Sequence, residues 1–384
     1  MSRALVPLLA ITFVDVLGFT ILIPILPFYA EHFGASPRTI GALYATVGLC
    51  SLVSSPLWGR LSDRIGRKGV LLAAQIAGFA GFSLLAASGT LEMVFLARAI
   101  EGLGGGGLGV TQAYVTDVTT PANRARAFGM LGATFGLGFL IGPALAAVLV
   151  PFGYRVPFAV AAALALLTCV LTVFLLPESR GPVLAAPSLA AIRDSLTSPR
   201  LGRLILTQFF FAITFTAWVS VFALFAERVL GFGAQQTTSI FVISAVVGII
   251  IQAGLIGRLV DRFGEGRIAV TGLTCAFAAY AGIGFVHTPL ALYAFVVLWS
   301  CSGALIRPSL GSLISAAAPE DQRGTILSVN DALGNVAFVV APFISTSVLT
   351  VNPAWSGAVS AVFAAAAIIC GAPLLLAKHV RSAA

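Results

Sequence analysis

Runs of about 20 apolar residues recur twelve times along this chain, and no other feature limits its possible folds so tightly. A helix that rises about 1.5 Å per residue needs about 20 residues to cross a hydrocarbon layer about 30 Å thick. The sequence therefore predicts an all-α integral membrane protein with twelve transmembrane helices. We expect spans at residues 5–28, 39–59, 69–88, 92–116, 125–150, 156–176, 202–226, 236–257, 268–286, 290–314, 324–348 and 354–377.

The composition excludes several other classes of protein. Hydrophobic residues make up 59% of the 384 residues and charged residues only 9%, whereas a soluble domain carries roughly 25% charged residues. The five Cys lie inside apolar runs and the three His lie far apart, so we expect no disulfide framework, no metal site and no cofactor. No cluster of His, Asp and Ser gathers at one interface, which argues against a membrane-embedded enzyme.

Lys and Arg are distributed unevenly between alternate segments. Seventeen of the 22 lie in the segments that share a side with the termini, and three lie on the other side, at Arg38, Arg155 and Arg228. Because Lys- and Arg-rich segments stay on the cytoplasmic side, we expect both termini to be cytoplasmic, in an inner membrane. Topology thus accounts for the net charge of +8, and no nucleic-acid partner is expected.

The two halves of the chain repeat each other. GRLSDRIG (59–66) returns as GRLVDRFG (257–264) with an offset of 198 residues, and Pro121 returns as Pro319 with the same offset. Two parallel six-helix halves are typical of one large class of secondary transporters. We expect pseudo-symmetric six-helix bundles at 1–176 and 201–384, joined by a cytoplasmic linker at 177–200.

Four stretches carry a resemblance to a known family. They are FVDVLGFTILIPILP (13–27), GRLSDRIGRKGVLL (59–72), ARAIEGLGG (97–105) and GFLIGPALA (138–146). In this order they resemble the motifs of the major facilitator superfamily, most of all its drug:proton antiporter branch, which includes the tetracycline exporters. The resemblance covers essentially the whole chain and implies a secondary active transporter. We expect a monomer that works by alternating access, with a small-molecule substrate and membrane lipid as its partners.

Three ionisable residues lie deep inside predicted spans. Asp15 is the single charge in residues 11–28, about 15 Å into the first span, and intramembrane charges normally carry function. Arg98 and Glu101 lie three residues apart and so share one helix face. The resemblance ties an arginine at the position of Arg98 to proton movement. We therefore expect proton coupling at Asp15, Arg98 and Glu101, with an i,i+3 ion pair as the structural alternative and Arg98 as the candidate partner of Asp15.

The repeated stretch is expected to form the loop between spans two and three, with two glycines allowing a tight turn. The resemblance implies a cytoplasmic latch between the halves, in which Asp117 is the acidic partner of the arginines. A plain polar loop is the alternative. The expected latch residues are Gly59, Asp63, Arg64, Gly66, Arg67, Asp117, Asp261 and Arg262.

Two glycine-rich stretches point to close helix packing. Gly138, Gly142 and Pro143 give the spacing GxxxGP in span five, which predicts a small-residue contact face, and the resemblance associates this motif with antiport. GLGGGG (102–107) is not preceded by a strand and not followed by GK[ST], so it does not indicate a nucleotide-binding loop.

The remaining polar residues in the spans are candidates for a substrate cavity. A mostly apolar cavity with one or two carboxylates suits a lipophilic small molecule, including a cationic one. Tetracycline–metal recognition is not expected, because the tetracycline exporters have a His in span eight and an acid in span nine, which this chain lacks. The candidates are Gln112, Tyr114, Gln208, Trp218, Gln252, Arg307, Asp331 and Asn335, with Arg307 and Asp331 expected to pair or to face one cavity.

The sequence thus predicts a proton-coupled exporter that uses the proton gradient as its energy source. A lipid or amphiphile exporter, an uncoupled facilitator and a receptor without transport activity remain as alternatives. Loss of transport when the proton gradient is collapsed would indicate a proton-coupled exporter. Unchanged transport would indicate an uncoupled facilitator.

Overall fold

The computed structural model describes residues 4–105, 107–179, 193, 197–318 and 323–376, and these residues form no strand. Twelve helical segments among them are long and apolar enough to cross a membrane, as predicted. The chain divides into two compact units, Met1–Ala186 with Ala234–Ser239, and Pro187–Gly233 with Ile240–Ala384. Most of the predicted linker at 177–200 lies outside the described residues.

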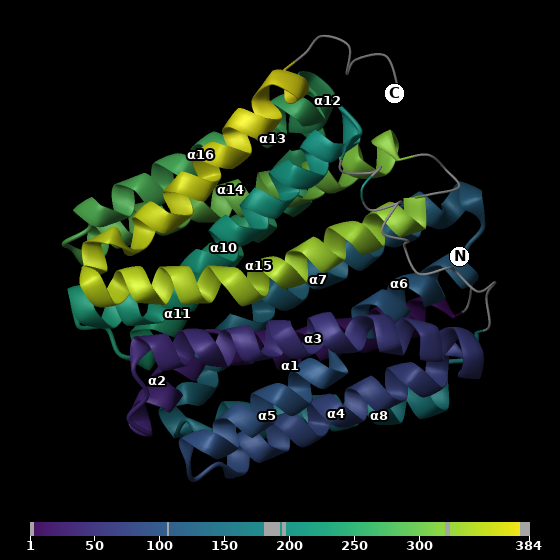
Figure 1. The fold of residues 1–384 in the computed structure, drawn as a ribbon, viewed down its shortest axis with the longest axis horizontal. Helices are drawn as coiled ribbons and strands as arrows, with labels where there is room; N and C mark the ends of the chain where they lie inside the picture. Colours follow the sequence, from purple (N-terminus) through teal and green to yellow (C-terminus); the bar gives the residue numbers. More distant parts are fainter. Residues whose placement is uncertain (1–3, 106, 180–192, 194–196, 319–322, 377–384) are drawn as a thin grey trace. The chain divides into compact units, whose positions relative to one another are not determined.

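The first unit contains the helices from α1 to α8 (Figure 1). They are α1 (Leu5–Leu22), α2 (Leu26–His32), α3 (Pro37–Ile65), α4 (Arg67–Ala87), α5 (Leu91–Gly104), α6 (Gly107–Asp117), α7 (Pro121–Leu149) and α8 (Arg155–Leu175). A 3₁₀ turn at Val150–Phe152 follows α7.

Helices of the second unit follow the same alternation of long segments and short connections (Figure 1). They are α10 (Leu201–Leu230), α12 (Ile256–Phe263), α13 (Glu265–Gly282), α14 (Pro289–Ala317), α15 (Arg323–Val351) and α16 (Ser356–Leu375). Helix α11 (Ala234–Ile249) begins in the first unit, to which Ala234–Ser239 belong, and continues in the second. A π-helical turn, Ile250–Leu255, lies between α11 and α12, and 3₁₀ turns lie at Ile283–Phe285 and Pro353–Trp355.

The two units share one packing scheme. In the first unit α1 packs against α7 and α8, and α4 packs against α5 and α8. In the second unit α10 packs against α15 and α16, and α13 packs against α14 and α16. Because α10, α13, α14, α15 and α16 occupy the places of α1, α4, α5, α7 and α8 in the repeat, the internal sequence repeat is also a structural one.

The first predicted span, 5–28, is broken near its end. Helix α1 stops at Leu22 and α2 begins at Leu26. Pro27 has no N–H to give to the carbonyl of Ile23, four residues earlier. The Tyr44 hydroxyl on α3 donates to that carbonyl at 2.8 Å instead. The break is therefore satisfied from the neighbouring helix, as backbone in a membrane must be.

The predicted loop at 59–68 is instead almost entirely helical. Helix α3 continues to Ile65 and α4 begins at Arg67, so Gly66 alone connects them, with φ +103°. Gly264 connects α12 to α13 in the same way, with φ +82°. Glycine reaches this region of φ without steric cost. Gly59 lies inside α3 and takes no part in the turn.

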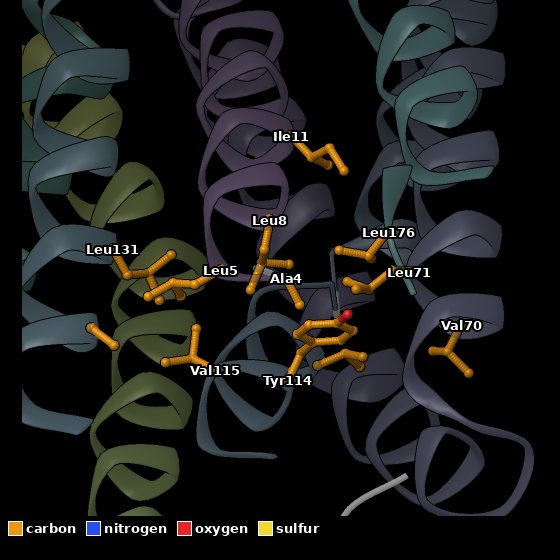
Figure 2. Close-up of a cluster of buried hydrophobic side chains, with 12 residues drawn as sticks. Ala4, Leu5, Leu8, Ile11, Val70, Leu71, Tyr114, Val115, Leu131 and Leu176 are labelled. Atoms are coloured by element: carbon orange, nitrogen blue, oxygen red, sulfur yellow. The ribbon is translucent and has the colours of Figure 1, made fainter. Parts of the chain in front are cut away.

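An apolar core holds one end of the first unit together (Figure 2). It joins the start of α1 (Leu5 and Leu8), the start of α4 (Leu71) and the ring of Tyr114 on α6. The Tyr114 ring is fully buried, and its hydroxyl donates to the carbonyl of Pro177 at 2.7 Å. The core also includes Leu131 of α7 and Leu176, which directly follows α8. It therefore joins four helices to the segment after α8.

Candidate functional site

Asp15 lies in the middle of α1, where α1 passes α8 and the side chain of Gln75 on α4. Gln75 Nε2 donates to Asp15 Oδ2 at 3.1 Å. Thr168 on α8 is fully buried and is the other side chain that hydrogen-bonds with the Asp15 carboxylate. Three helices thus converge on this carboxylate, and uncharged groups surround it. Sequence reasoning missed Gln75, although it is the one amide in α4.

Arg98 and Glu101 form a buried ion pair within α5. Their side chains are 3% and 7% exposed, and the pair spans one helical turn. Among the described residues no ion pair joins Arg98 to Asp15. Of the two partners that the sequence leaves open for Arg98, Asp15 and Glu101, the structure shows the i,i+3 pair with Glu101.

The glycines of GxxxGP press α7 against α1 next to Asp15. A Cβ atom added to Gly138 would run into Val16, and one added to Gly142 would run into Thr20. The Thr20 hydroxyl donates to the carbonyl of Gly138 at 2.9 Å. The predicted small-residue contact is thus made with α1, and Val16 directly follows Asp15 in the chain.

Span four, predicted as one helix over 92–116, is divided between α5 and α6 at the GLGGGG stretch. A Cβ atom on Gly102 would meet Val47 and Cys50, which shows how closely α3 and α5 approach. Ser51 and Ser54 on α3 donate to the carbonyl of Gly102 at 3.1 and 3.2 Å. Hydroxyl groups from α3 thus hydrogen-bond with the backbone near the end of α5.

A second polar group, the Arg67 cluster, lies where α3 ends and α4 begins. We define it as Ser62, Asp63, Arg67, Asp117 and Ser179. Arg67 forms ion pairs with Asp63 and, at 3.2 Å, with Asp117, and the Ser179 hydroxyl donates to Asp117 Oδ2 at 3.0 Å. The predicted pairing of Asp117 with an arginine of the motif is thus made by Arg67. Arg64 is exposed and takes no part in the cluster.

Glu178, which sequence reasoning missed, holds the start of α4. Its Oε1 accepts hydrogen bonds from the backbone N–H groups of Lys68 and Ser179 at 3.1 and 3.0 Å. Arg67 N–H donates to the carbonyl of Ser179 at 3.1 Å. The polar sequence PES directly after the sixth apolar run was the available signal, because a carboxylate is favoured at a helix N-terminus.

The repeat of this motif in the second unit forms no such cluster. Asp261 and Arg262 are both exposed, and the Arg262 guanidinium lies over the ring of Phe263 at 5.3 Å. The residue at the repeat position of Arg67 is Glu265, and Ser315 stands at that of Asp117. Among the described residues Asp261 and Arg262 form no ion pair, and their expected part in a latch stays a prediction.

Two of the cavity candidates are core residues instead. Tyr114 belongs to the apolar core described above, and Trp218 is 2% exposed, packed against Phe222, Phe225 and Tyr280. Neither side chain is available to line a cavity in this conformation. Tyr and Trp each combine a large apolar ring with one polar atom. Counting them among the polar residues of the spans overlooks the packing of the ring.

The other candidates lie on different helices. Gln112 and Asn335 are partly buried, Gln252 is exposed in the π-helical turn, and Gln208 Oε1 is buried without a hydrogen-bond partner among the described residues. π-Helical turns, like the one that contains Gln252, are frequent at functional sites. Arg307 is exposed on α14, and its guanidinium stacks 4.4 Å above the ring of Phe215. The side chain of Asp331 lies outside what the structure describes, so its pairing with Arg307 stays a prediction.

An aromatic group beside Arg307 was not predicted from the sequence. Phe215 stacks on Trp299, and Trp299 also contacts Phe222 and Phe241, with ring centroids 6.0 to 6.2 Å apart. These rings come from α10, α11 and α14. Among the described residues no group of three His, Cys, Asp or Glu side chains could hold a metal ion.

Comparison with known proteins gives one family and a consistent set of relatives. The family model described as the Major Facilitator Superfamily matches residues 8–342 and, in a second match, 253–384. The chain is 32% identical to Multidrug resistance protein 2 of Bacillus subtilis (strain 168), over 86% of this chain and 85% of the relative. It is 25% identical to the class C tetracycline resistance protein of Escherichia coli, over 96% of each.

Solved structures share the fold at lower identity. A crystal structure of the human organic anion transporter MFSD10 matches with a TM-score of 0.76 and 21% identity, covering 97% of this chain and 99% of that one. A POT family transporter in complex with a thioalcohol-conjugated peptide matches with a TM-score of 0.78 and 16% identity, covering 97% and 96%.

Proposed function

The chain belongs to the Major Facilitator Superfamily, and from this premise we propose that it exports lipophilic small molecules, including cationic ones, in exchange for protons. That it is a membrane transporter and not an enzyme follows from the family and from its relatives. The exchange, its direction and the inner membrane with cytoplasmic termini are parts of the proposal.

The observation that carries the proposal is the environment of Asp15. A carboxylate in the middle of a membrane helix is costly and is kept where it has a function. Its hydrogen-bonding partners are the neutral side chains of Gln75 and Thr168. Because no Lys or Arg among the described residues forms an ion pair with it, the carboxylate can be neutralised by a proton or by a cationic substrate, and these two compete for one site. Such competition is the physical basis of antiport.

The packing of α1 supports a coupling between this competition and movement. Val16 and Thr20 fit against Gly138 and Gly142, so α1 has little freedom to shift independently of α7. A change at Asp15 that moves α1 must therefore move α7 or separate the two helices. Alternating access between two pseudo-symmetric halves is the movement that we propose, as is general for transporters built from two repeats.

Multidrug efflux is favoured over tetracycline–metal export. The relative at 32% identity is named for multidrug resistance. Span eight contains Gln252 and no His, and no acidic residue lies between 268 and 286, so both residues that the resemblance associates with the tetracycline exporters are lacking there. The partly buried ring of Phe215, which stacks on Trp299, offers an apolar surface to such a substrate.

Transport in proteoliposomes tests the proposal. With a lipophilic cationic dye as substrate, we expect uptake or release driven by an imposed pH gradient, and its loss on addition of a protonophore. Asp15→Asn should abolish the gradient-driven component while the purified protein remains folded. Glu92→Gln, which removes an exposed carboxylate of α5 in the same unit, is the matched control and should transport normally.

Two results would contradict the proposal. Gradient-driven transport by Asp15→Asn at the wild-type rate would show that Asp15 is not the proton site. Wild-type transport that is unaffected by the protonophore would favour an uncoupled facilitator instead.

A further inference from the structure

Gln75 has one end of its amide bound and the other end unsatisfied. The side chain is 7% exposed, and its Nε2 donates to Asp15 Oδ2 at 3.1 Å. Its Oε1 is buried and has no hydrogen-bond partner among the described residues. A buried acceptor left without a donor is costly, and such groups in a native fold call for an explanation.

The chemistry of the Asp15 and Gln75 side chains supplies an explanation for this unsatisfied acceptor. An ionised carboxylate can only accept hydrogen bonds, whereas a protonated carboxyl also donates one. A glutamine amide carries a donor and an acceptor on the same group, and rotation about its terminal torsion exchanges their positions. Gln75 can therefore donate through Nε2 to the ionised Asp15, and accept through Oε1 from the protonated Asp15.

Thr168 differs from Gln75 in its hydrogen-bonding capacity. Its hydroxyl carries one proton, which is donated to the carbonyl of Ala165 at 2.8 Å, so Thr168 can donate to the ionised Asp15 only by giving up this bond to the backbone. The Cys169 thiol on α8 is within electrostatic reach of Asp15 and carries no charge to stabilise the carboxylate. Helix α7 has no ionisable residue after Arg126.

The nearest charged side chains on α4 and on the helices that pack against it lie more than one helical turn from Gln75. Arg67 and Lys68 are about two turns away at the start of α4, and Arg67 is occupied in its cluster. Arg98 and Glu101 bind each other where α5 passes Gly81, between one and two turns beyond Gln75. Gln75 is thus the side chain that donates to the ionised carboxylate without giving up a backbone hydrogen bond.

We propose that Gln75 is a positioning residue for proton transfer at Asp15, whose amide turns over as the carboxylate gains and loses its proton. This inference rests on the proposed role of Asp15 as the proton site. A proton from water binds Asp15, the carboxyl donates to Gln75 Oε1, and on release the proton returns to water while both amide protons stay on Nε2. The amide thereby stabilises each state in turn and holds the carboxyl group in one orientation.

Infrared difference spectra between acid and alkaline pH test the inference without relying on transport. The C=O band of a protonated carboxyl group that is present in wild type and missing in Asp15→Asn reports the protonation of Asp15. In Gln75→Leu the band should move to higher frequency, since the carboxyl loses its acceptor. The pH at which half the band is present should move toward alkaline by roughly one unit, because the ionised form loses the stronger hydrogen bond.

Gln235→Leu, at an exposed position of α11, is the matched control and should leave the band and its midpoint unchanged. Gln75→Met serves as a second replacement should the Leu variant not be recovered folded, with the same expected shifts. An unchanged frequency and midpoint in both Gln75 variants would overturn the inference while leaving Asp15 as the proton site. A titrating band that Asp15→Asn still shows would overturn the proton site, and the inference with it.

Discussion

Arg67 and Asp117 join two helices that are 50 residues apart in the chain: Arg67 Nε at the start of α4 donates to Asp117 Oδ2 at the end of α6, at 3.2 Å. Arg67 is 2% exposed, so its charge is withdrawn from water and depends on its carboxylate partners. Loss of one partner leaves a buried charge poorly compensated, which is strongly destabilising. We therefore expect substitutions in the Arg67 cluster to destabilise the protein more than substitutions at the corresponding exposed positions of the second unit.

The internal repeat allows a matched test of this difference. Asp63→Ala removes an acid that is 12% exposed and bonded to Arg67, and we expect the protein to lose about 3 kcal/mol of stability. Asp261→Ala removes the equivalent acid of the second unit, which is exposed, and should change stability by less than about 0.5 kcal/mol. Melting temperatures in detergent measure both. Equal losses would contradict the assigned burial of the two sites.

The one-residue connections offer a second matched pair. Gly66→Ala should be destabilising for two reasons, because the backbone has φ +103° and because the new Cβ would meet the Glu178 carboxylate. Gly264→Ala carries only the backbone strain, about 1–3 kcal/mol, since nothing lies within 4 Å of its Cβ position. Thermal unfolding should therefore rank Gly66→Ala below Gly264→Ala. Combining Gly66→Ala with Glu178→Ala should cost less than the sum of the single losses.

Close packing of α1 on α7 predicts opposite effects for two glycines of one helix. Gly142→Ala should destabilise the protein by about 1–3 kcal/mol and impair transport, because Thr20 occupies the space of the new methyl group. Gly132→Ala, where the space is open, should be neutral or gain up to about 1 kcal/mol through helix propensity. The comparison needs melting temperatures and transport rates of the two variants. A stable, active Gly142→Ala would contradict the packing.

The buried pair in α5 separates a structural role from one in transport. Arg98→Met and Glu101→Met should each cost about 3 kcal/mol, because each leaves one buried charge alone. The double variant should recover most of this stability, since an apolar pair of similar volume replaces the ion pair. We expect it to remain defective in gradient-driven transport if Arg98 takes part in proton movement. Normal transport by the double variant would assign the pair to structure alone.

Much of the fold could be predicted because its determinants are local in the sequence. Hydropathy over about 20 residues defines the twelve spans, and the repeat of GRLSDRIG as GRLVDRFG indicates two related halves. Helix interruptions were harder to predict. Pro27 weakens span one, but the break is tolerated because Tyr44, a distant residue in the chain, supplies the missing hydrogen bond. Long-range compensation of this kind leaves no local signal.

The candidate site was predicted only in part for the same reason. Asp15 stands out by charge, and Gly138 and Gly142 stand out by spacing. Gln75 does not, since a single amide in an apolar run shows its importance only when α4 is placed beside α1. Arg98 shows a different limit, because its depth in the membrane leaves both Asp15 and Glu101 open as partners, and only the structure shows the pair with Glu101.

The Arg67 cluster has a consequence for how the two copies of the motif tolerate substitution. At the repeat positions of Arg67 and Asp117 the second copy has Glu265 and Ser315, so Asp261 has no arginine to hold in the way that Asp63 holds Arg67. We therefore expect most substitutions of Asp63 to be lost from a library selected for folded protein and most substitutions of Asp261 to be retained, although both positions carry Asp. A deep mutational scan should show two different tolerance profiles for one motif.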